Sequence, residues 1–231
     1  MKKFLKKGLI WIKWALIIFF GSSIFFVLLY RFILPPVTPL MVIRLAEQLF
    51  HNEPLKLKKN YVALKDISSS LQLAVVSSED NRFLEHHGLD LDAIEKAKVY
   101  NEKKQGKKFR GASTISQQTA KNVFLWPQRS WFRKGLEVYF TSLIEFIWGK
   151  KRIMEVYLNV IEMGKGIYGA EAAAQTYFGK PAAKLSRGES ALLAAILPNP
   201  QKWSPNSPTP YLLERQEWIL WNMGNIGKID F

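Results

Sequence analysis

A long apolar segment near the N-terminus constrains this chain more than any other feature. Leu9 to Tyr30 are 22 mostly apolar residues that contain a single charge, Lys13. At about 1.5 Å per residue, such a helix is about 33 Å long, which matches the roughly 30 Å hydrocarbon core of a bilayer. Lys13 lies about one turn inside the segment, where its side chain can reach the headgroups. The segment therefore predicts a single-pass transmembrane anchor at residues 9–30.

The charges beside this segment predict its orientation. Residues 1–8 contain four lysines, whereas only Arg31 directly follows the apolar run. The positive-inside rule then places residues 1–8 in the cytoplasm and the body of the chain in the periplasm, at the inner membrane. A cleaved secretory peptide is the alternative. It is disfavoured because the run exceeds the usual apolar region of about 7 to 15 residues and no small-x-small cleavage signal follows.

Length and composition limit what the rest of the chain can be. With 231 residues, 48% of them hydrophobic, it can form one sizeable core plus appendages. The absence of cysteine excludes a disulfide framework, a thiolate metal site and a cysteine nucleophile. The net charge of +14 indicates an anionic partner. Outside the inner membrane, that partner is expected to be phospholipid or a lipid-linked phosphate rather than nucleic acid.

The stretch SSEDNRFLEHHGLD follows a predicted helix. Ser70 can cap a helix that ends at Glu79 and Asp80. Carboxylates at a helix C-terminus oppose the helix dipole, so they do not stabilise the helix and suggest another role. On its own, the stretch suits a solvated helix end as well as it suits a catalytic site.

Further helices are expected downstream, and the body should be mainly α. A buried helix face is predicted by four apolar residues spaced at i, i+3, i+4 and i+7, and a capping box precedes SALLAAIL. These residues are Ile153, Val156, Tyr157 and Val160 for the face, and Ser186 with Glu189 for the box. The basic run between Glu95 and Arg110 is interpreted as a solvated loop.

A polar helix face is predicted in GASTISQQTAKN. From a cap at Ser113 or Thr114, one face would carry a hydroxyl, two amides and an ammonium. The residues are Thr114, Gln117, Gln118 and Lys121. Several donors with a positive charge among them are what a bound phosphate or sugar requires.

The segment FLWPQRSWFRKGLE interleaves aromatic and basic residues. Such a mixture suits single-stranded nucleic acid or a membrane surface, and the anchor favours the membrane. Glu137 follows Arg133 by four residues and Lys134 by three, so its simplest interpretation is a surface ion pair worth about 0.3 to 0.5 kcal/mol. Spacing alone does not favour a functional role for this acid.

Five ordered motifs together resemble the monofunctional biosynthetic peptidoglycan glycosyltransferases, glycosyltransferase family 51. They are EDNRFLEHHG, GASTISQQTAKN, RKGLE, RIMEVYLNVIEMGKGIYGAEAAAQTYFGK and LSRGESALLAAILPNP, and they lie between about residues 60 and 200. Ser116 departs from the family, which more often has threonine there. The resemblance implies a mainly α, lysozyme-like body with a small membrane-embedded jaw around Phe124 to Arg133. Residues 31–59 would be a linker and membrane-proximal region, and residues 60–231 the catalytic domain.

The resemblance also implies a reaction. Lipid II would be polymerised into glycan strands with inversion at the anomeric carbon and release of undecaprenyl pyrophosphate, for cell wall biosynthesis. Glu79 would be the catalytic base, and Lys121 and Arg129 would bind the pyrophosphate, with Arg133 and Lys134 adding to the positive field. Glu137 matches the family's second important acid, and its role stays open. No S-x-x-K or K-T-G motif of a transpeptidase occurs.

The remaining assignments follow from the same resemblance and from chemistry. A diphosphate with hard oxygen ligands would favour Mg²⁺ or Mn²⁺ over zinc, and no organic cofactor is expected. Expected partners are lipid II, the growing lipid-linked glycan and the bilayer, with cell division or wall synthesis proteins as further candidates. A hydrolase of similar shape and a non-catalytic lipid-binding scaffold are the competing hypotheses. Substrate contact is assigned to Thr114, Gln117, Gln118 and Asn122, and shaping of the loop to Asp80, Phe83, His86 and Gly88.

Overall fold

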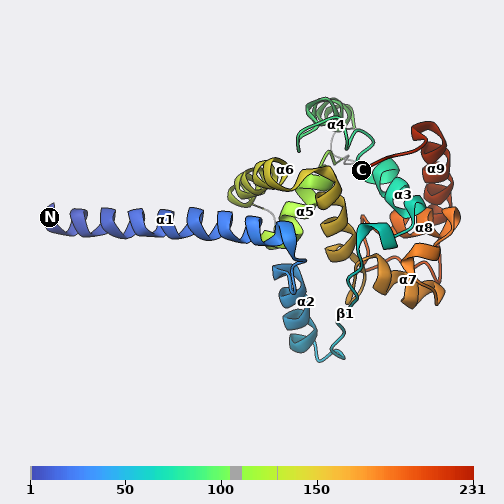
Figure 1. Ribbon diagram of the computed structural model, residues 1–231, viewed down its shortest axis with the longest axis horizontal. Helices are drawn as coiled ribbons and strands as arrows, with labels where there is room; N and C mark the ends of the chain where they lie inside the picture. Colours follow the sequence, from blue (N-terminus) through green and yellow to red (C-terminus); the bar gives the residue numbers. More distant parts are fainter. Residues whose placement is uncertain (1, 105–110, 129) are drawn as a thin grey trace. The chain divides into compact units, whose positions relative to one another are not determined.

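The computed structural model describes residues 2–104, 111–128 and 130–231 (Figure 1). The side chains of residues 2–6 also lie outside the description. The chain divides into two compact units, residues 1–34 and residues 35–231, and each is described by itself.

The first unit is a single helix, α1 (Lys2–Phe32). Its segment Lys7–Phe32 has a mean hydropathy of 2.2 and is long and apolar enough to cross a membrane. Large apolar side chains such as Trp11 and Ile18 are 74% and 66% exposed, so this helix does not bury its apolar surface within its own unit. By length and composition, α1 is compatible with a single-pass membrane anchor.

The second unit confirms the prediction of a mainly α body. Residues 39–50, within the region assigned above to the linker, form a helix. The interpretation of the basic run after Glu95 as a loop was wrong for residues 95–103, which belong to a helix, and residues 105–110 of that run lie outside the described residues. The helices of this unit are α2 (Pro39–Phe50), α3 (Ser69–Glu79), α4 (Leu91–Lys103), α5 (Ile115–Phe124), α6 (Trp131–Val160), α7 (Ala170–Phe178), α8 (Arg187–Ile196) and α9 (Pro210–Ile226). Two short 3₁₀ turns span Leu64–Asp66 and Ala182–Lys184.

Local capping signals explain where several helices begin. Thr114 caps α5 and Ser186 caps α8, and each forms a capping box with the residue three positions later, as predicted for Ser186. The cap of α3 is Ser68, so the prediction of Ser70 was wrong. The Ser68 side chain accepts a hydrogen bond from the Ser70 amide, and its hydroxyl also donates to the Leu185 carbonyl at 3.0 Å. That long-range contact favours Ser68 over its neighbours.

Two groups of helices form the core of the second unit. Helices α3, α8 and α9 pack together, and α5 packs along α6 (Figure 1). The predicted buried face of α6 is confirmed, because Ile153, Val156, Tyr157 and Val160 are all fully buried. This packing brings the C-terminal end of α3 close to α5, so residues that lie far apart in the sequence meet there.

A small sheet completes the unit. Its order is β1 (Lys58–Lys59), β3 (Ile167–Tyr168), β2 (Glu162–Gly164), with β1 parallel and β2 antiparallel to β3. Gly166, in the turn between β2 and β3, has φ +68°, and a Cβ there would lie 2.2 Å from the Lys56 carbonyl oxygen. Only glycine allows the turn to approach the chain before β1 so closely.

Helix α6 is interrupted at Gly149. This residue has φ 74° and ψ 166°, which are not helical angles. The helix therefore consists of two segments, residues 131–148 and 150–160.

Candidate active site

Glu79 is the last residue of α3 and lies beside α5. Its Oε2 accepts a hydrogen bond from Gln118 Nε2 at 2.9 Å, and its Oε1 lies 3.5 Å from Arg215 Nη2. The Glu79 side chain is 13% exposed. Oε1 also accepts a hydrogen bond from the Ser78 hydroxyl at 3.4 Å. The carboxylate is thus held by one amide, one hydroxyl and one arginine from α9, yet it keeps access to solvent.

Gln118 links this acid to a buried phenol. Its Oε1 accepts a hydrogen bond from the Tyr157 hydroxyl at 3.2 Å, while its Nε2 donates to Glu79. Burial raises the pKa of Tyr157 well above its usual value, and the nearby carboxylates of Glu79 and Asp80 raise it further. The phenol therefore stays protonated and keeps the amide group of Gln118 oriented with its NH₂ toward Glu79.

Asp80 connects the loop after α3 to α5. Its carboxylate accepts a hydrogen bond from the Ile115 amide at 3.0 Å and lies 2.9 Å from His86 Nε2. The Gly88 amide donates to His86 Nδ1 at 3.1 Å, so the ring proton is on Nε2 and faces Asp80. Asp80 is 7% exposed, so these bonds are made in a largely dry environment.

The same loop is closed by Phe83, Gly88 and Thr114. Phe83 is fully buried, with its ring centroid 6.5 Å from that of His86. Gly88 has φ +92°, and its carbonyl accepts a hydrogen bond from Thr114 Oγ1 at 2.6 Å. Loop 80–88 is thereby attached to the N-terminus of α5.

Thr114 and Gln117 are used within the fold. Both are 2% exposed, and their side chains form the capping box of α5. Their assignment to substrate contact stays a prediction. Gln118, the next residue, donates to Glu79, and Lys121, one turn further on, lines the cavity described next.

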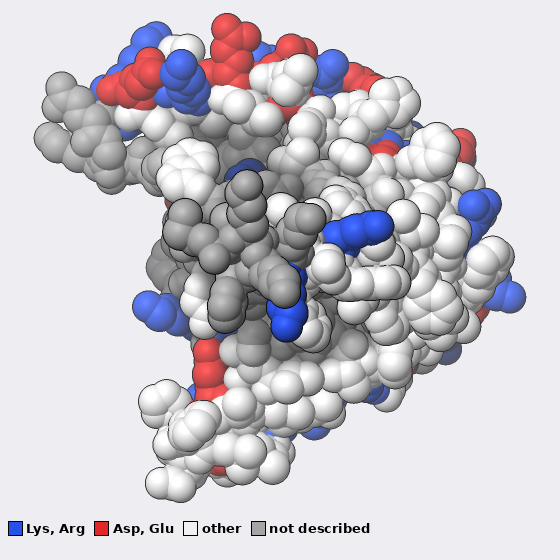
Figure 2. All heavy atoms as spheres, turned by 90° about the vertical axis from the view of Figure 1, so that its left-hand side faces the viewer, with Lys and Arg blue, Asp and Glu red and all other residues white. Residues whose placement is uncertain are grey.

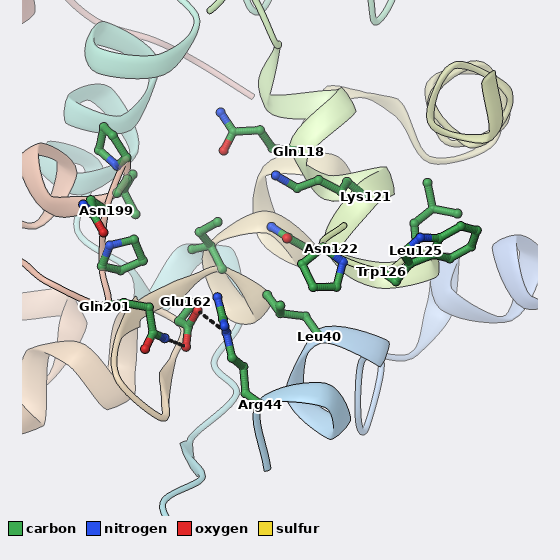
Figure 3. Close-up of a pocket in the computed structure, with 15 residues that line it drawn as sticks. Leu40, Arg44, Gln118, Lys121, Asn122, Leu125, Trp126, Glu162, Asn199 and Gln201 are labelled. Carbon is green, nitrogen blue, oxygen red and sulfur yellow. Dashed lines mark hydrogen bonds and ion pairs between the residues drawn. The ribbon is translucent and has the colours of Figure 1, made fainter. Parts of the chain in front are cut away.

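A cavity of about 270 Å³ lies between α5, α2 and the loop after α8 (Figure 3). Gln118, Lys121 and Asn122 extend into it from α5. Arg44 and Glu162 lie across from them, with Asn199 and Gln201. Gln118 also donates a hydrogen bond to Glu79, and Lys121 lies one helical turn after Gln118. The same turn of α5 therefore contacts Glu79 and carries Lys121 into the cavity. Leu40, Leu125, Trp126, Pro127, Ile161, Leu197, Pro198 and Pro200 complete the lining.

Asn122 has an unused donor at this cavity. The residue is 4% exposed, and its Nδ2 has no hydrogen-bond partner among the described residues. A buried amide nitrogen without a partner costs free energy, so it suggests a site for a ligand oxygen.

Glu137 occupies a second, separate charged cluster at the start of α6. Its Oε2 accepts from Arg133 Nη1 at 3.0 Å and its Oε1 from Lys134 Nζ at 2.5 Å. The Glu137 and Arg133 side chains are 4% and 9% exposed, so the interpretation as a surface ion pair was wrong. Arg129 lies outside the described residues.

Three aromatic side chains of α6 are exposed. Trp131 is 92% exposed, Phe132 71% and Phe146 90%. Exposed aromatic groups of this size are typical of a surface that contacts lipid or protein.

Charged side chains gather elsewhere. In the face of the molecule shown in Figure 2, acidic and basic side chains lie along the upper edge, at the height of α4 in Figure 1.

Sequence reasoning missed several residues of the site. Arg215 comes from α9, to which no role was assigned, and Arg44 from the region interpreted as a linker. Glu162 is 4% exposed, and burial raises its pKa despite the opposing effect of Arg44. A glutamate between apolar residues in VIEMG was the one local signal that could have identified Glu162.

The chain is similar to a family of known proteins. The Transglycosylase family model matches residues 47–224. A biosynthetic peptidoglycan transglycosylase of Bacteroides thetaiotaomicron is 57% identical over 97% of this chain and 90% of the relative. Proteins of the same name from Bdellovibrio bacteriovorus and Pseudomonas entomophila are 56% and 50% identical. These matches cover 91% and 92% of this chain, and 83% and 89% of the relatives.

Proposed function

The chain belongs to the transglycosylase family and acts in peptidoglycan synthesis for the cell wall, and we propose that it polymerises lipid II into glycan strands. The 4-hydroxyl of one sugar would attack the anomeric carbon of the other with inversion, and undecaprenyl pyrophosphate would leave. The chain would act as a glycosyltransferase alone, without a transpeptidase activity.

Glu79 is the proposed general base. A base must reach the proton of the attacking hydroxyl and must be ionised before the reaction. Gln118 donates to one oxygen of Glu79, and Arg215 lies 3.5 Å from the other. Oε2 accepts the shorter bond from Gln118, whereas Oε1 has only the longer contacts with Ser78 Oγ at 3.4 Å and with Arg215, so Oε1 is the oxygen more available for the substrate proton.

Lys121 is the proposed partner of the leaving diphosphate. Pyrophosphate is a stable anion, so its departure needs positive charge rather than an acid. Lys121 lines the cavity one turn beyond Gln118, and the amide of Asn122 beside it can donate to a phosphate oxygen. Arg129 would extend this cationic surface.

Glu137 is proposed as a positioning residue. Both of its oxygens are engaged by Arg133 and Lys134, so it holds two cations in place and has no oxygen left for a substrate proton. The net charge of the three groups is still positive, which suits an anionic substrate or headgroup.

A divalent cation at the diphosphate stays a prediction. Among residues 2–104, 111–128 and 130–231, no group of three His, Cys, Asp or Glu side chains is placed to hold an ion. The Glu137 carboxylate is occupied by its two cations. These residues do not form a protein cage for Mg²⁺ or Mn²⁺, and no step above uses one.

The membrane arrangement follows from α1. We propose that α1 crosses the inner membrane with residues 1–8 in the cytoplasm, which leaves the catalytic unit in the periplasm. Exposed Trp131 and Phe132 would then contact the bilayer as the jaw that the family resemblance implies. A lipid-linked substrate could reach the cavity without leaving the membrane surface.

The link from Glu79 through Gln118 to the cavity of Lys121 is the observation that carries this proposal. The test uses the purified full-length protein in detergent with labelled lipid II. Long glycan strands and free undecaprenyl pyrophosphate are the expected products. If strands fail to form while preformed peptidoglycan is degraded, the protein is a hydrolase. If the protein neither forms strands nor degrades peptidoglycan, the result favours the non-catalytic lipid-binding scaffold.

A further inference from the structure

A second cavity, of about 250 Å³, adjoins the first. One polar face of α2 lines it, with Arg44, Glu47, Gln48 and His51 at i, i+3, i+4 and i+7. Glu53, Lys165 and Gln201 complete the lining. Every described residue in the lining is thus charged, an amide or an imidazole.

Arg44 and Gln201 line both cavities and form the wall between them. Arg44 Nη1 donates to Glu47 Oε2 at 2.6 Å, and Gln201 Nε2 donates to Glu162 Oε1. Arg44 Nε lies 3.4 Å from Glu162 Oε2 but is a buried donor without a hydrogen bond among the described residues. The wall therefore consists of polar side chains, and Arg44 Nε can still donate a hydrogen bond to a ligand.

Both signs of charge alternate around the second cavity. Arg44 pairs with Glu47, and Lys165 Nζ lies 2.6 Å from Glu53 Oε2. The Lys165 and Glu53 side chains are 54% and 37% exposed, so their ion pair contributes little to stability. Each can therefore leave the other and pair with a charged group of a ligand at a small cost in free energy. A ligand with carboxylates and an amino group would complement such a lining, whereas a simple anion or an apolar chain would not.

The two cavities together reach the size of a site for one extended ligand. The Lys121 side of the first cavity is assigned to the diphosphate, and Arg44 and Gln201 lie on the opposite wall (Figure 3). A branch that leaves the sugar ring away from the diphosphate would point toward this wall. In the substrate proposed above, that branch is a peptide with carboxylates and an amine.

We propose that the second cavity binds the peptide carried by the substrate's muramic acid sugar. Arg44 and Lys165 take the peptide's carboxylates, and Glu47 and Glu53 take its amino group. This inference rests on the proposed function, because it assigns a specificity subsite to the same reaction.

The test compares two substrates on the full-length protein in detergent. One is lipid II with its complete peptide, and the other is lipid II in which the peptide is cut back to its first residue. Lys165→Ala should raise KM for the complete substrate about twofold to fivefold, the effect of one partly exposed charged contact. Its KM for the shortened substrate and its kcat for both should stay unchanged. Glu53→Gln should show the same selectivity.

Lys180→Ala is the matched control. Lys180 also pairs with a glutamate, at 2.7 Å from Glu189 Oε1, but lines neither cavity. It should change neither KM. Equal KM changes for both substrates in Lys165→Ala, or none, would overturn the peptide subsite while leaving polymerisation intact. If the wild type polymerises neither substrate, the proposed function fails, and the subsite with it.

Discussion

Glu79 and Glu137 are both carboxylates enclosed by the second unit, yet their surroundings differ. Glu79 is 13% exposed, accepts hydrogen bonds from a neutral amide and a neutral hydroxyl, and has an arginine only at 3.5 Å. Glu137 is 4% exposed and has a cation within 3.0 Å of each oxygen. A base needs an oxygen that a substrate can reach, whereas an anchor for cations needs both oxygens engaged. This difference supports the proposal that Glu79 transfers the proton and that Glu137 is a positioning residue.

Replacement of Glu79 by glutamine should have the largest effect. The amide is almost isosteric and cannot take a proton, so the rate of lipid II polymerisation should fall about a hundredfold to ten-thousandfold. This corresponds to about 3 to 5 kcal/mol in activation free energy. Binding of lipid II and the thermal unfolding temperature should change little. A near-normal rate would show that Glu79 is not the base and that the two acids do not differ in this role.

Glu137→Gln should act mainly on stability. It leaves the buried Arg133 guanidinium without its counter-ion, and removal of one partner of a buried pair typically costs about 3 kcal/mol. Denaturant unfolding of the full-length protein in detergent measures this change in the free energy of unfolding. Activity per folded molecule should fall less than in Glu79→Gln.

A double variant sharpens this result. Arg133→Met combined with Glu137→Leu removes both charges, so it should recover much of the stability lost in Glu137→Gln. If Glu137→Gln alone is as stable as the wild type but inactive, Glu137 takes part in the chemistry and is not only a positioning residue.

The smallest expected effect concerns Glu162, a third buried acid. Burial raises its pKa above the usual 4.5, so the folded protein keeps a proton at pH values where the unfolded chain has lost it. The free energy of unfolding should therefore fall as the pH rises from about 4.5 through the raised pKa. Glu162→Gln should flatten this slope in thermal unfolding measured across that range. An unchanged slope would show that Arg44 keeps Glu162 ionised.

Local signals predicted α3, α5, α8 and the buried end of α6, but not α2 or α4, whose residues were interpreted as a linker and a loop. The caps at Thr114 and Ser186 depend on residues three positions apart, so they can be identified without the fold. The position of Glu79 at the end of α3 also follows from a short stretch. The choice of Ser68 over Ser70 could not be predicted, because it involves a hydroxyl bond to the distant Leu185 carbonyl.

The parts of the site that sequence did not predict all come from long-range packing. Arg215 reaches Glu79 from α9, and Asn222 on the same helix donates to the Ser77 carbonyl at 2.6 Å, across 145 positions. No local spacing encodes such contacts. The burial of Glu137 is similar, because α6 was expected to present that residue to solvent and packing of the second unit covers it.

The break in α6 at Gly149 divides the supports of the two acids. Glu137 belongs to the segment before the break, and Tyr157, which orients Gln118, to the segment after it. A Cβ at Gly149 would meet nothing within 4 Å, so only the backbone angle calls for glycine there. The two segments are therefore separate helices joined at one glycine. Because no helical turn continues across Gly149, a change in the direction of the first segment need not displace Tyr157 or the Gln118 amide.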